Sequence, residues 1–288
     1  MATANMKDVK RRIKSVESTR QITKAMELVA SSKLRRAKER ALAAQPFFAA
    51  VYDTMADVSR DHVFSSIYTK KEMLKTTLLI VIAGDRGLAG GFNHNVLKLA
   101  LEKANEHRAE GYTVKIITIG KKAVEYFKKR DFEVLDEYPG IAENLDVYDS
   151  LDIAENVITR FRLGEFDKVE IVYTTFVSAL TQEPVHMPVL PVKQMISGSG
   201  EKKSLMIYDP SPEEVFDGLI PQYMSGILYA AIVDSFASEQ AARRTAMESA
   251  SDNADEMIES LSLMYNRARQ SQITQELTEI ASGSLRDE

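Results

Sequence analysis

The chain has no cysteine and no long apolar run. Without cysteine it has no disulfide, no thiolate nucleophile, no iron–sulfur ligand and none of the common structural zinc sites. No stretch of 18 apolar residues could span a bilayer, and the first residues lack the apolar segment of a secretory signal. We therefore expect a protein that stays inside the cell and does not cross a membrane by itself.

Helix-breaking residues are scarce at the N-terminal end. The first glycine is Gly84, and the only proline before it is Pro46. Within this stretch apolar or small residues recur at steps of three and four, which predicts one long amphipathic helix. These residues are Met6, Val9, Ile13, Val16, Thr23, Met26, Ala30, Leu34, Ala37 and Ala41.

The C-terminal end has a more regular pattern, a heptad of alternating three- and four-residue steps that is typical of coiled coils. From Gln222 onward only Gly226 and Gly283 could interrupt a helix. The pattern predicts a helix of about 80 to 90 Å. The heptad consists of Met247, Ala250, Ala254, Met257, Leu261, Met264 and Ala268.

The charges of the two ends are opposite. The whole chain has a net charge of −5, but Lys7 to Arg40 carries +8 and Asp209 to the end carries −10. Two long helices with opposite charge can bury their apolar stripes against each other and attract each other electrostatically. We therefore predict an antiparallel coiled coil made of residues 1–60 and 209–286.

Between these helices the pattern changes to alternating strands and helices, which predicts a Rossmann-like α/β domain over residues 75–195. The fold class is therefore α/β, with terminal coiled-coil helices flanking that domain. Residues 197–203 are expected to form a flexible loop. Strands are predicted at 76–83, 113–119, 132–135, 168–174 and 185–195, and helices at 95–110, 121–130 and 150–163.

Residues 84–93 (GDRGLAGGFN) follow the first predicted strand, where a dinucleotide fingerprint would lie. The G-x-G-x-x-G spacing is absent, no GK[ST] forms a P-loop, and the second strand ends in Gly120 rather than in an acid. We interpret the loop as a structural turn or a partner-contact loop and predict no bound cofactor.

No catalytic or metal-binding pattern is evident. The four histidines, His62, His94, His107 and His186, lie in separate elements without an i, i+4 pair, so no metal site is predicted. There is no G-x-S-x-G elbow either. The basic N-terminal helix could suggest a nucleic-acid arm, but its acidic mate in the same chain neutralises much of that charge, so no nucleic-acid partner is expected.

The last segment, residues 266–282, is mostly polar and extends past the apolar seam. An unpaired helix of about four turns is marginal in water. We therefore expect this segment to have a socket in another protein.

Four separated blocks, in order, resemble the gamma-subunit family of bacterial F-type ATP synthases, over essentially the whole chain. The blocks are residues 13–30, residues 85–93, residues 238–243 and residues 265–277. The resemblance implies the same architecture and a non-catalytic role as the central stalk of the complex. Its tip would turn inside the alpha and beta subunits, and its foot would meet the epsilon subunit and the c-ring.

The resemblance implies no nucleotide binding by this chain. It implies that proton or sodium flow through the ring drives rotation, coupled to ATP synthesis or hydrolysis. The chain would be peripheral, at the cytoplasmic face of the bacterial cell membrane, and would meet the membrane only through the complex. The absence of cysteine and of a transit peptide favours a bacterial rather than a chloroplast or mitochondrial source.

Eight residues match the family's contact positions. Met26 and Arg243 match shaft contacts with the beta subunits, although Met26 is also interpretable as a coiled-coil core residue and Arg269 as a solvated arginine. Tyr208 and Asp209 match the foot, near the ring and the epsilon subunit. The family's polar contacts near the bearing, where the tip would turn inside the alpha and beta subunits, match Arg269, Gln270, Thr274 and Glu276.

Two other hypotheses remain open at this stage. A static coiled-coil scaffold would use the same helices without rotation. A Rossmann-domain oxidoreductase would bind a dinucleotide.

Overall fold

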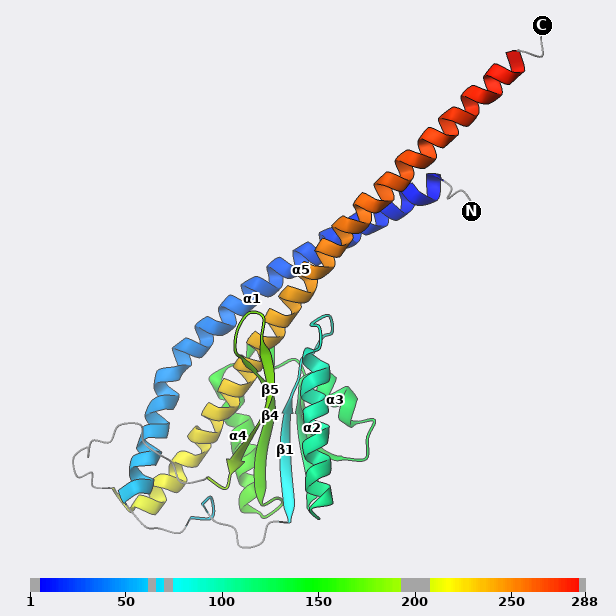
Figure 1. Cartoon of the computed structure of the whole chain (residues 1–288). Coiled ribbons are helices and arrows are strands. Elements are labelled where there is room, and N and C mark those ends of the chain that lie inside the picture. Colours follow the sequence, from blue (N-terminus) through cyan, green and yellow to red (C-terminus); the bar gives the residue numbers. More distant parts are fainter. Residues whose placement is uncertain (1–5, 62–65, 70–74, 193–207, 285–288) are drawn as a thin grey trace. The chain divides into compact units, whose positions relative to one another are not determined.

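The computed structural model describes residues 6–61, 66–69, 75–192 and 208–284. The chain divides into two compact units, Met1–Ala30 with Arg244–Glu288, and Ser31–Arg243. The two terminal helices, α1 (Met6–Asp61) and α5 (Pro212–Ser284), each contribute to both units (Figure 1). The predicted loop at 197–203 lies outside the described residues.

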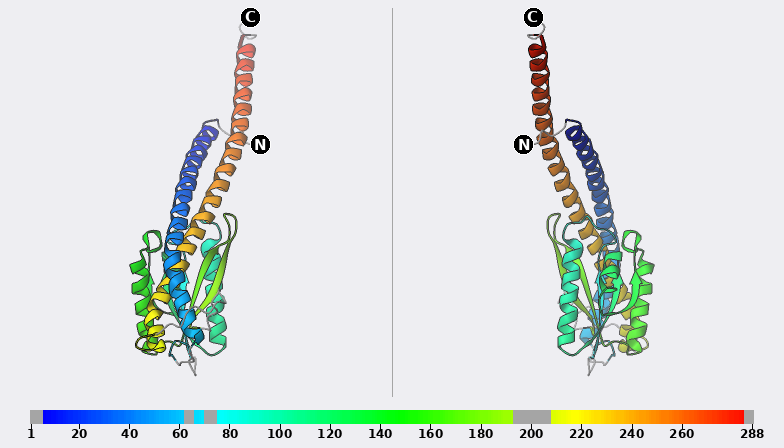
Figure 2. Two further views of the ribbon diagram at one scale, coloured as in Figure 1. Left: turned by 90° about the vertical axis from the view of Figure 1, so that its left-hand side faces the viewer. Right: turned by 90° about the vertical axis from the view of Figure 1, so that its right-hand side faces the viewer.

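In the first unit, α1 and α5 lie side by side and antiparallel (Figure 2). The hydroxyls of Thr23 and Ser251 are 2.7 Å apart, and Arg20 pairs with Asp255 at 2.6 Å, so residue numbers rise along one helix as they fall along the other. The predicted coiled coil of opposite charge is therefore confirmed. Its buried seam includes Val9, Thr23, Ala30, Met247, Ser251 and Ala254.

The apolar heptad of α5 is longer than the buried seam. Met247 and Ala254 are buried, but Met257 and Met264 are 58% and 52% exposed. Every side chain from 269 to 278 is exposed, in agreement with the expectation of a helix end that projects past its mate. The apolar pattern thus predicts more seam than α1 covers.

Both terminal helices contain a proline. Pro46 lies inside α1 and Pro221 inside α5, where each removes one backbone hydrogen bond. The C-terminal coiled-coil segment is predicted over 209–286, and α5 begins at Pro212 and continues through Pro221. Phe216 and Ile220 are fully buried in the core, and this burial offsets the missing hydrogen bond.

The second unit is built on a five-stranded sheet with the order β3-β2-β1-β4-β5. The first four strands are parallel in a Rossmann-like order, and β5 joins β4 antiparallel. The predicted strands are all present, with ends that shift by a few residues. Their bounds are β1 (Thr76–Ile82), β2 (Thr113–Ile119), β3 (Glu133–Tyr138), β4 (Lys168–Phe176) and β5 (Gln182–Leu190).

Helices cover both faces of the sheet (Figure 1). Alternate residues of β1 enter two separate cores, because successive strand side chains point to opposite faces. Leu78 and Ile80 pack with α4 and with the unit's parts of α1 and α5, while Leu79 and Val81 pack with α2 and α3. The bounds are α2 (Phe92–Ala109), α3 (Lys121–Phe127), η1 (Ala142–Asn144) and α4 (Val147–Arg162).

Candidate functional site

The loop after β1 is held by its own side chains. Asp85 Oδ1 accepts the backbone N–H groups of Lys121 at 2.9 Å and Gly140 at 2.8 Å. Asn93 accepts from the N–H of Gly84 at 2.8 Å and donates to the carbonyl of Arg86 at 3.0 Å. The backbone N–H groups of Gly84, Lys121 and Gly140, at the carboxyl ends of the strands, therefore donate to side chains of this loop.

Arg243 lies inside the second unit. Its side chain is about one tenth exposed, and its guanidinium donates to Glu239 Oε1 at 2.5 Å and to the carbonyl of Gly87 at 3.1 Å. Burial raises the pKa of the Glu239 carboxyl, and the charge of Arg243 opposes that rise. The arginine matched to a family contact position thus fastens α5 to the loop after β1.

The other matched residues are distributed over both units. Met26 is half-buried on α1 in the first unit. In the second unit Tyr208 packs against the core that includes α5, and the neighbouring Asp209 is exposed. Met26 and the matched residues near the C-terminal end thus belong to the first unit, and Tyr208 and Asp209 to the second.

The C-terminal end of α5 presents four matched residues on its surface. Arg269, Gln270, Thr274 and Glu276 are all exposed. Two apolar residues one turn apart lie among them, since Ile273 is 48% and Leu277 62% exposed. This stretch combines an apolar stripe with polar neighbours, which is the pattern of a helix that binds in a groove of another protein.

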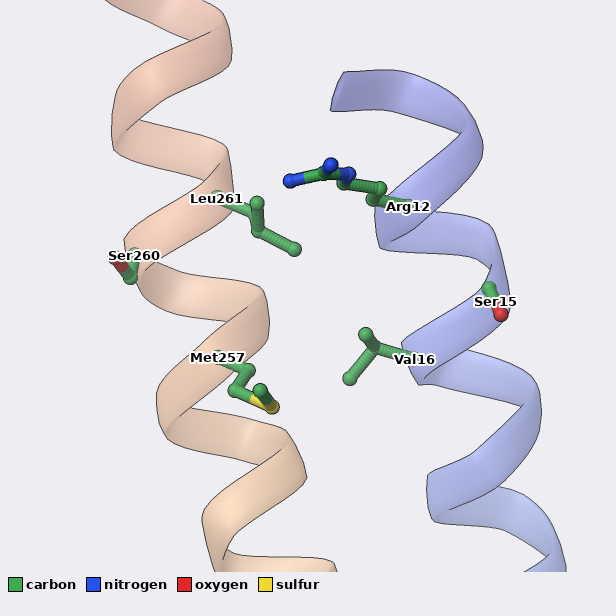
Figure 3. A pocket seen from close by; sticks show the side chains of 6 residues that line it. All are labelled: Arg12, Ser15, Val16, Met257, Ser260 and Leu261. Atoms are coloured by element: carbon green, nitrogen blue, oxygen red, sulfur yellow. The ribbon is translucent and has the colours of Figure 1, made fainter. Parts of the chain in front are cut away.

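A pocket between α1 and α5 was not foreseen from the sequence. It lies within the first unit, has a volume of about 330 Å³, and opens where the helices separate (Figure 3). Val16, Met257 and Leu261 supply its apolar wall, and Arg12 extends toward it. Ser15 and Ser260 complete the lining.

Sequence spacing also gives no sign of a buried cluster in the second unit. His107 and His186 both place Nε2 against one oxygen of Glu170, at 2.7 and 2.6 Å. Glu170 is 63 residues from His107 and 16 from His186, so no short motif joins them. Two signals were available: His107 continues the buried stripe of Ala100 and Ala104, and Glu170 interrupts an apolar strand.

Among the described helices, none has a long apolar stretch with few charges that could cross a membrane.

Comparison with known proteins agrees with this architecture. The family model described as "ATP synthase" matches residues 5–285. The chain is 67% identical to the ATP synthase gamma chain of Ruminococcus albus, over 99% of both chains. It is 41% identical to the sodium-ion-specific gamma chain of Acetobacterium woodii, over 97% of this chain and 98% of that one.

The fold also matches solved rotors at low sequence identity. A chain of the rotor of Euglena gracilis mitochondrial ATP synthase aligns with a TM-score of 0.64 at 19% identity, covering 93% of this chain and 98% of that chain. Full-length identity to the bacterial relatives establishes the family. The chain belongs to the ATP synthase gamma chains, the non-catalytic subunits that form the central stalk of this rotary motor.

Proposed function

We propose that this chain transmits torque between an ion-driven c-ring and the alpha and beta subunits of the catalytic head. In this proposal residues 1–60 and 209–286 are the shaft, and residues 75–195 form a domain that meets the c-ring and the epsilon subunit. The chain would lie at the cytoplasmic face of the bacterial membrane and reach it only through the complex. The same mechanism serves protons or sodium ions.

The observation that carries the proposal is the exposed end of α5. Ile273 and Leu277 present apolar surface that a partner must cover, because a single helix gains most of its stability from packing. An apolar collar of the catalytic head is a suitable cover. The surrounding polar residues suit a sliding contact, since exposed ion pairs contribute only about 0 to 1 kcal/mol each and can exchange.

We propose the eight matched residues as partner contacts within this scheme. Arg269, Gln270, Thr274 and Glu276 would meet the catalytic head. Tyr208 and Asp209 would meet the c-ring and the epsilon subunit. Met26 and Arg243 would meet the beta subunits, and Arg243 would do so through the one tenth of its side chain that stays exposed.

The contact proposal is tested by substitution in the reconstituted complex. We expect Arg269→Ala combined with Thr274→Ala to lower coupled ATP synthesis while the melting temperature of the isolated chain stays unchanged, because both side chains are exposed. The matched control is Arg36→Ala together with Thr19→Ala, which changes two exposed residues of α1. Equal coupling in both double variants would argue against a bearing at the end of α5.

A cross-link that blocks rotation distinguishes the hypothesis of a rotating shaft from that of a static scaffold. The chain has no cysteine, so Leu28→Cys, at a position that is 63% exposed, would supply a unique thiol. This position lies where α1 pairs with α5. Two paired helices should not unwind to let the rest of the shaft turn past a cross-link at this position. A disulfide from this thiol to a cysteine on a catalytic subunit should abolish hydrolysis, and a reductant should restore it. Full hydrolysis by the cross-linked complex would support the static scaffold instead.

A further inference from the structure

Three side chains from three elements converge in the second unit. His107 lies in the last turn of α2, Glu170 in β4 and His186 in β5. The imidazole Nε2 atoms of both histidines approach Glu170 Oε2, and the three potential ligand atoms all lie within 4.8 Å of one another. Packed secondary structure fixes all three backbones, so the cluster is a built site and not a chance meeting of surface side chains.

The carboxylate at its centre is buried and contacts three basic side chains. The side chain of Glu170 is 1% exposed, and the ammonium of Lys168 pairs with its Oε1 atom. Burial raises the pKa of Glu170, but hydrogen bonds from His186, Lys168 and His107 outweigh burial and bring the pKa to about 2. Lys168 thus contacts Oε1, and the two imidazoles contact Oε2.

The other side of the His107 ring, away from Glu170, also has neighbours that could orient it. Its Nδ1 atom is buried, makes no hydrogen bond among the described residues, and lies 3.6 Å from Glu110 Oε2. The ring of Tyr112 meets the imidazole edge-on, with the ring centroids 5.8 Å apart. A carboxylate behind a histidine commonly orients the ring of a metal ligand and raises its basicity.

We propose that His107, Glu170 and His186 form a binding site for a divalent transition-metal ion, with Zn²⁺ as the best match. Two imidazole nitrogens and one carboxylate oxygen suit Zn²⁺, whereas Mg²⁺ and Ca²⁺ prefer oxygen ligands alone. The side chain of His186 is 22% exposed and that of His107 9%, so a fourth position at the His186 side is open to a water molecule. The site does not depend on the torque proposal.

Only small movements are needed to admit the ion. Ligand bonds of about 2.0 to 2.2 Å in a tetrahedral site separate neighbouring ligand atoms by roughly 3.3 Å. The present N···O separations of 2.6 and 2.7 Å are those of hydrogen bonds. Each imidazole therefore withdraws by less than about 1 Å and binds the ion through a deprotonated Nε2, as the neutral tautomer with its proton on Nδ1. His186 lies on the edge strand β5, where such a shift disturbs no further strand.

The charges near the site limit its affinity and its ion selectivity. Lys168 and Lys103 repel a cation, while Glu170 and Glu110 attract it. The side chain of Lys168 is 26% exposed and can turn toward water when a metal neutralises the carboxylate. A bound ion would join the end of α2 to β4 and β5, and it would stabilise this unit by RT ln(1 + c/Kd), where c is the concentration of free ion.

The test uses the full-length chain after treatment with a chelator. Isothermal titration with ZnCl₂ should give one saturable site, and Zn²⁺ should raise the melting temperature while equimolar MgCl₂ does not. His186→Ala should weaken Zn²⁺ binding by more than about 10- to 100-fold, the loss that even outer-shell substitutions typically cause. His94→Ala is the matched control, because His94 is an exposed histidine outside the cluster.

A second variant guards against a folding defect. Glu170→Gln keeps the size of the buried side chain and removes its charge, and melting without metal reports whether the variant folds. If the wild-type chain shows no saturable Zn²⁺ binding, the cluster is a closed hydrogen-bond network and the proposal fails. It fails equally if folded His186→Ala and His94→Ala bind Zn²⁺ with the same affinity.

Discussion

The carboxylate of Glu239 lies against the bare Cα of Gly84, so that a Cβ built on Gly84 would stand 2.8 Å from both Cδ and Oε1 of Glu239. The same carboxylate accepts the hydrogen bond from Arg243, which also reaches the carbonyl of Gly87. A glycine at position 84 thus lets α5 approach the end of β1 closely enough for this contact.

We expect Gly84→Ala to destabilise the second unit by about 1 to 3 kcal/mol, the usual cost of overpacking a filled site. The new methyl group displaces the Glu239 carboxylate and leaves Arg243 with a poorer partner in a buried place. Urea unfolding followed by circular dichroism measures the change. Gly87→Ala is the control, since no atom lies within 4 Å of the methyl group it would add. Equal stability of the two variants would contradict the close approach.

A second close approach joins α5 to α1 within the same unit. A Cβ on Gly226 would overlap the ring of Phe48, so Gly226→Ala should lower the free energy of unfolding by about 1 to 3 kcal/mol. Gly218→Ala in the same helix meets nothing within 4 Å. That control should instead stabilise the helix by about 0.5 to 1 kcal/mol. Opposite signs in thermal melting are the expected result, and two stabilising changes would contradict it.

The hydroxyl pair in the first unit should show coupling. Thr23→Val and Ser251→Ala each remove one partner of the 2.7 Å contact, and each should cost about 0.5 to 1.5 kcal/mol. The double variant should cost less than the sum, because neither hydroxyl is then left without its mate.

The surviving hydroxyl in each single variant can still donate to its own helix, as Thr23 does to Arg20 O and Ser251 to Met247 O, which keeps the cost modest. Exposed Thr19 makes the same kind of bond to Ser15 O, and Thr19→Val should change stability by less than about 0.5 kcal/mol. Strict additivity in the cycle would show that the pair contributes nothing.

The burial of Tyr223 should make the folded chain less stable at high pH. Burial raises the pKa of Tyr223 to about 12, against about 10 in the unfolded chain. The folded state therefore favours the protonated phenol, and this contribution is complete below pH 10 and is lost as the pH rises from 10 toward 12. In urea unfolding at pH 9 to 11.5, Tyr223→Phe should lose less stability than the parent. Tyr148→Phe, at a side chain that is 74% exposed, should behave like the parent.

The fold could be predicted where a pattern repeats. Residues 113–119 are rich in β-branched side chains and are followed by Gly120, which adopts a φ of 90°, and the predicted strand has the observed ends. The continuation of α5 through Pro221 does not follow from local rules, because an internal proline is a helix breaker. Only the tertiary core that buries Phe216 shows why the helix continues.

The candidate site was less accessible to sequence reasoning. The heptad marks Met257 and Met264 as seam residues, but both are exposed, and Met257 lies where α1 and α5 separate at the pocket, a divergence that the pattern of one helix does not encode. The cluster around Glu170 depends on strand register, because β5 must pair with β4 so that His186 stands beside Val172. Such a pairing of distant residues is set by topology rather than by spacing.

The contact between Thr23 and Ser251 joins residues that are 228 positions apart, and this separation sets an order in time. A ribosome adding 5 to 20 residues per second makes the second residue roughly 11 to 46 s after the first. For most of that interval Val9 and Ala30 are already made, while the helix that buries them in the finished unit is not. The nascent chain must therefore carry an uncovered apolar stripe until its last segment is made, and its first helix is among the last elements to find its place.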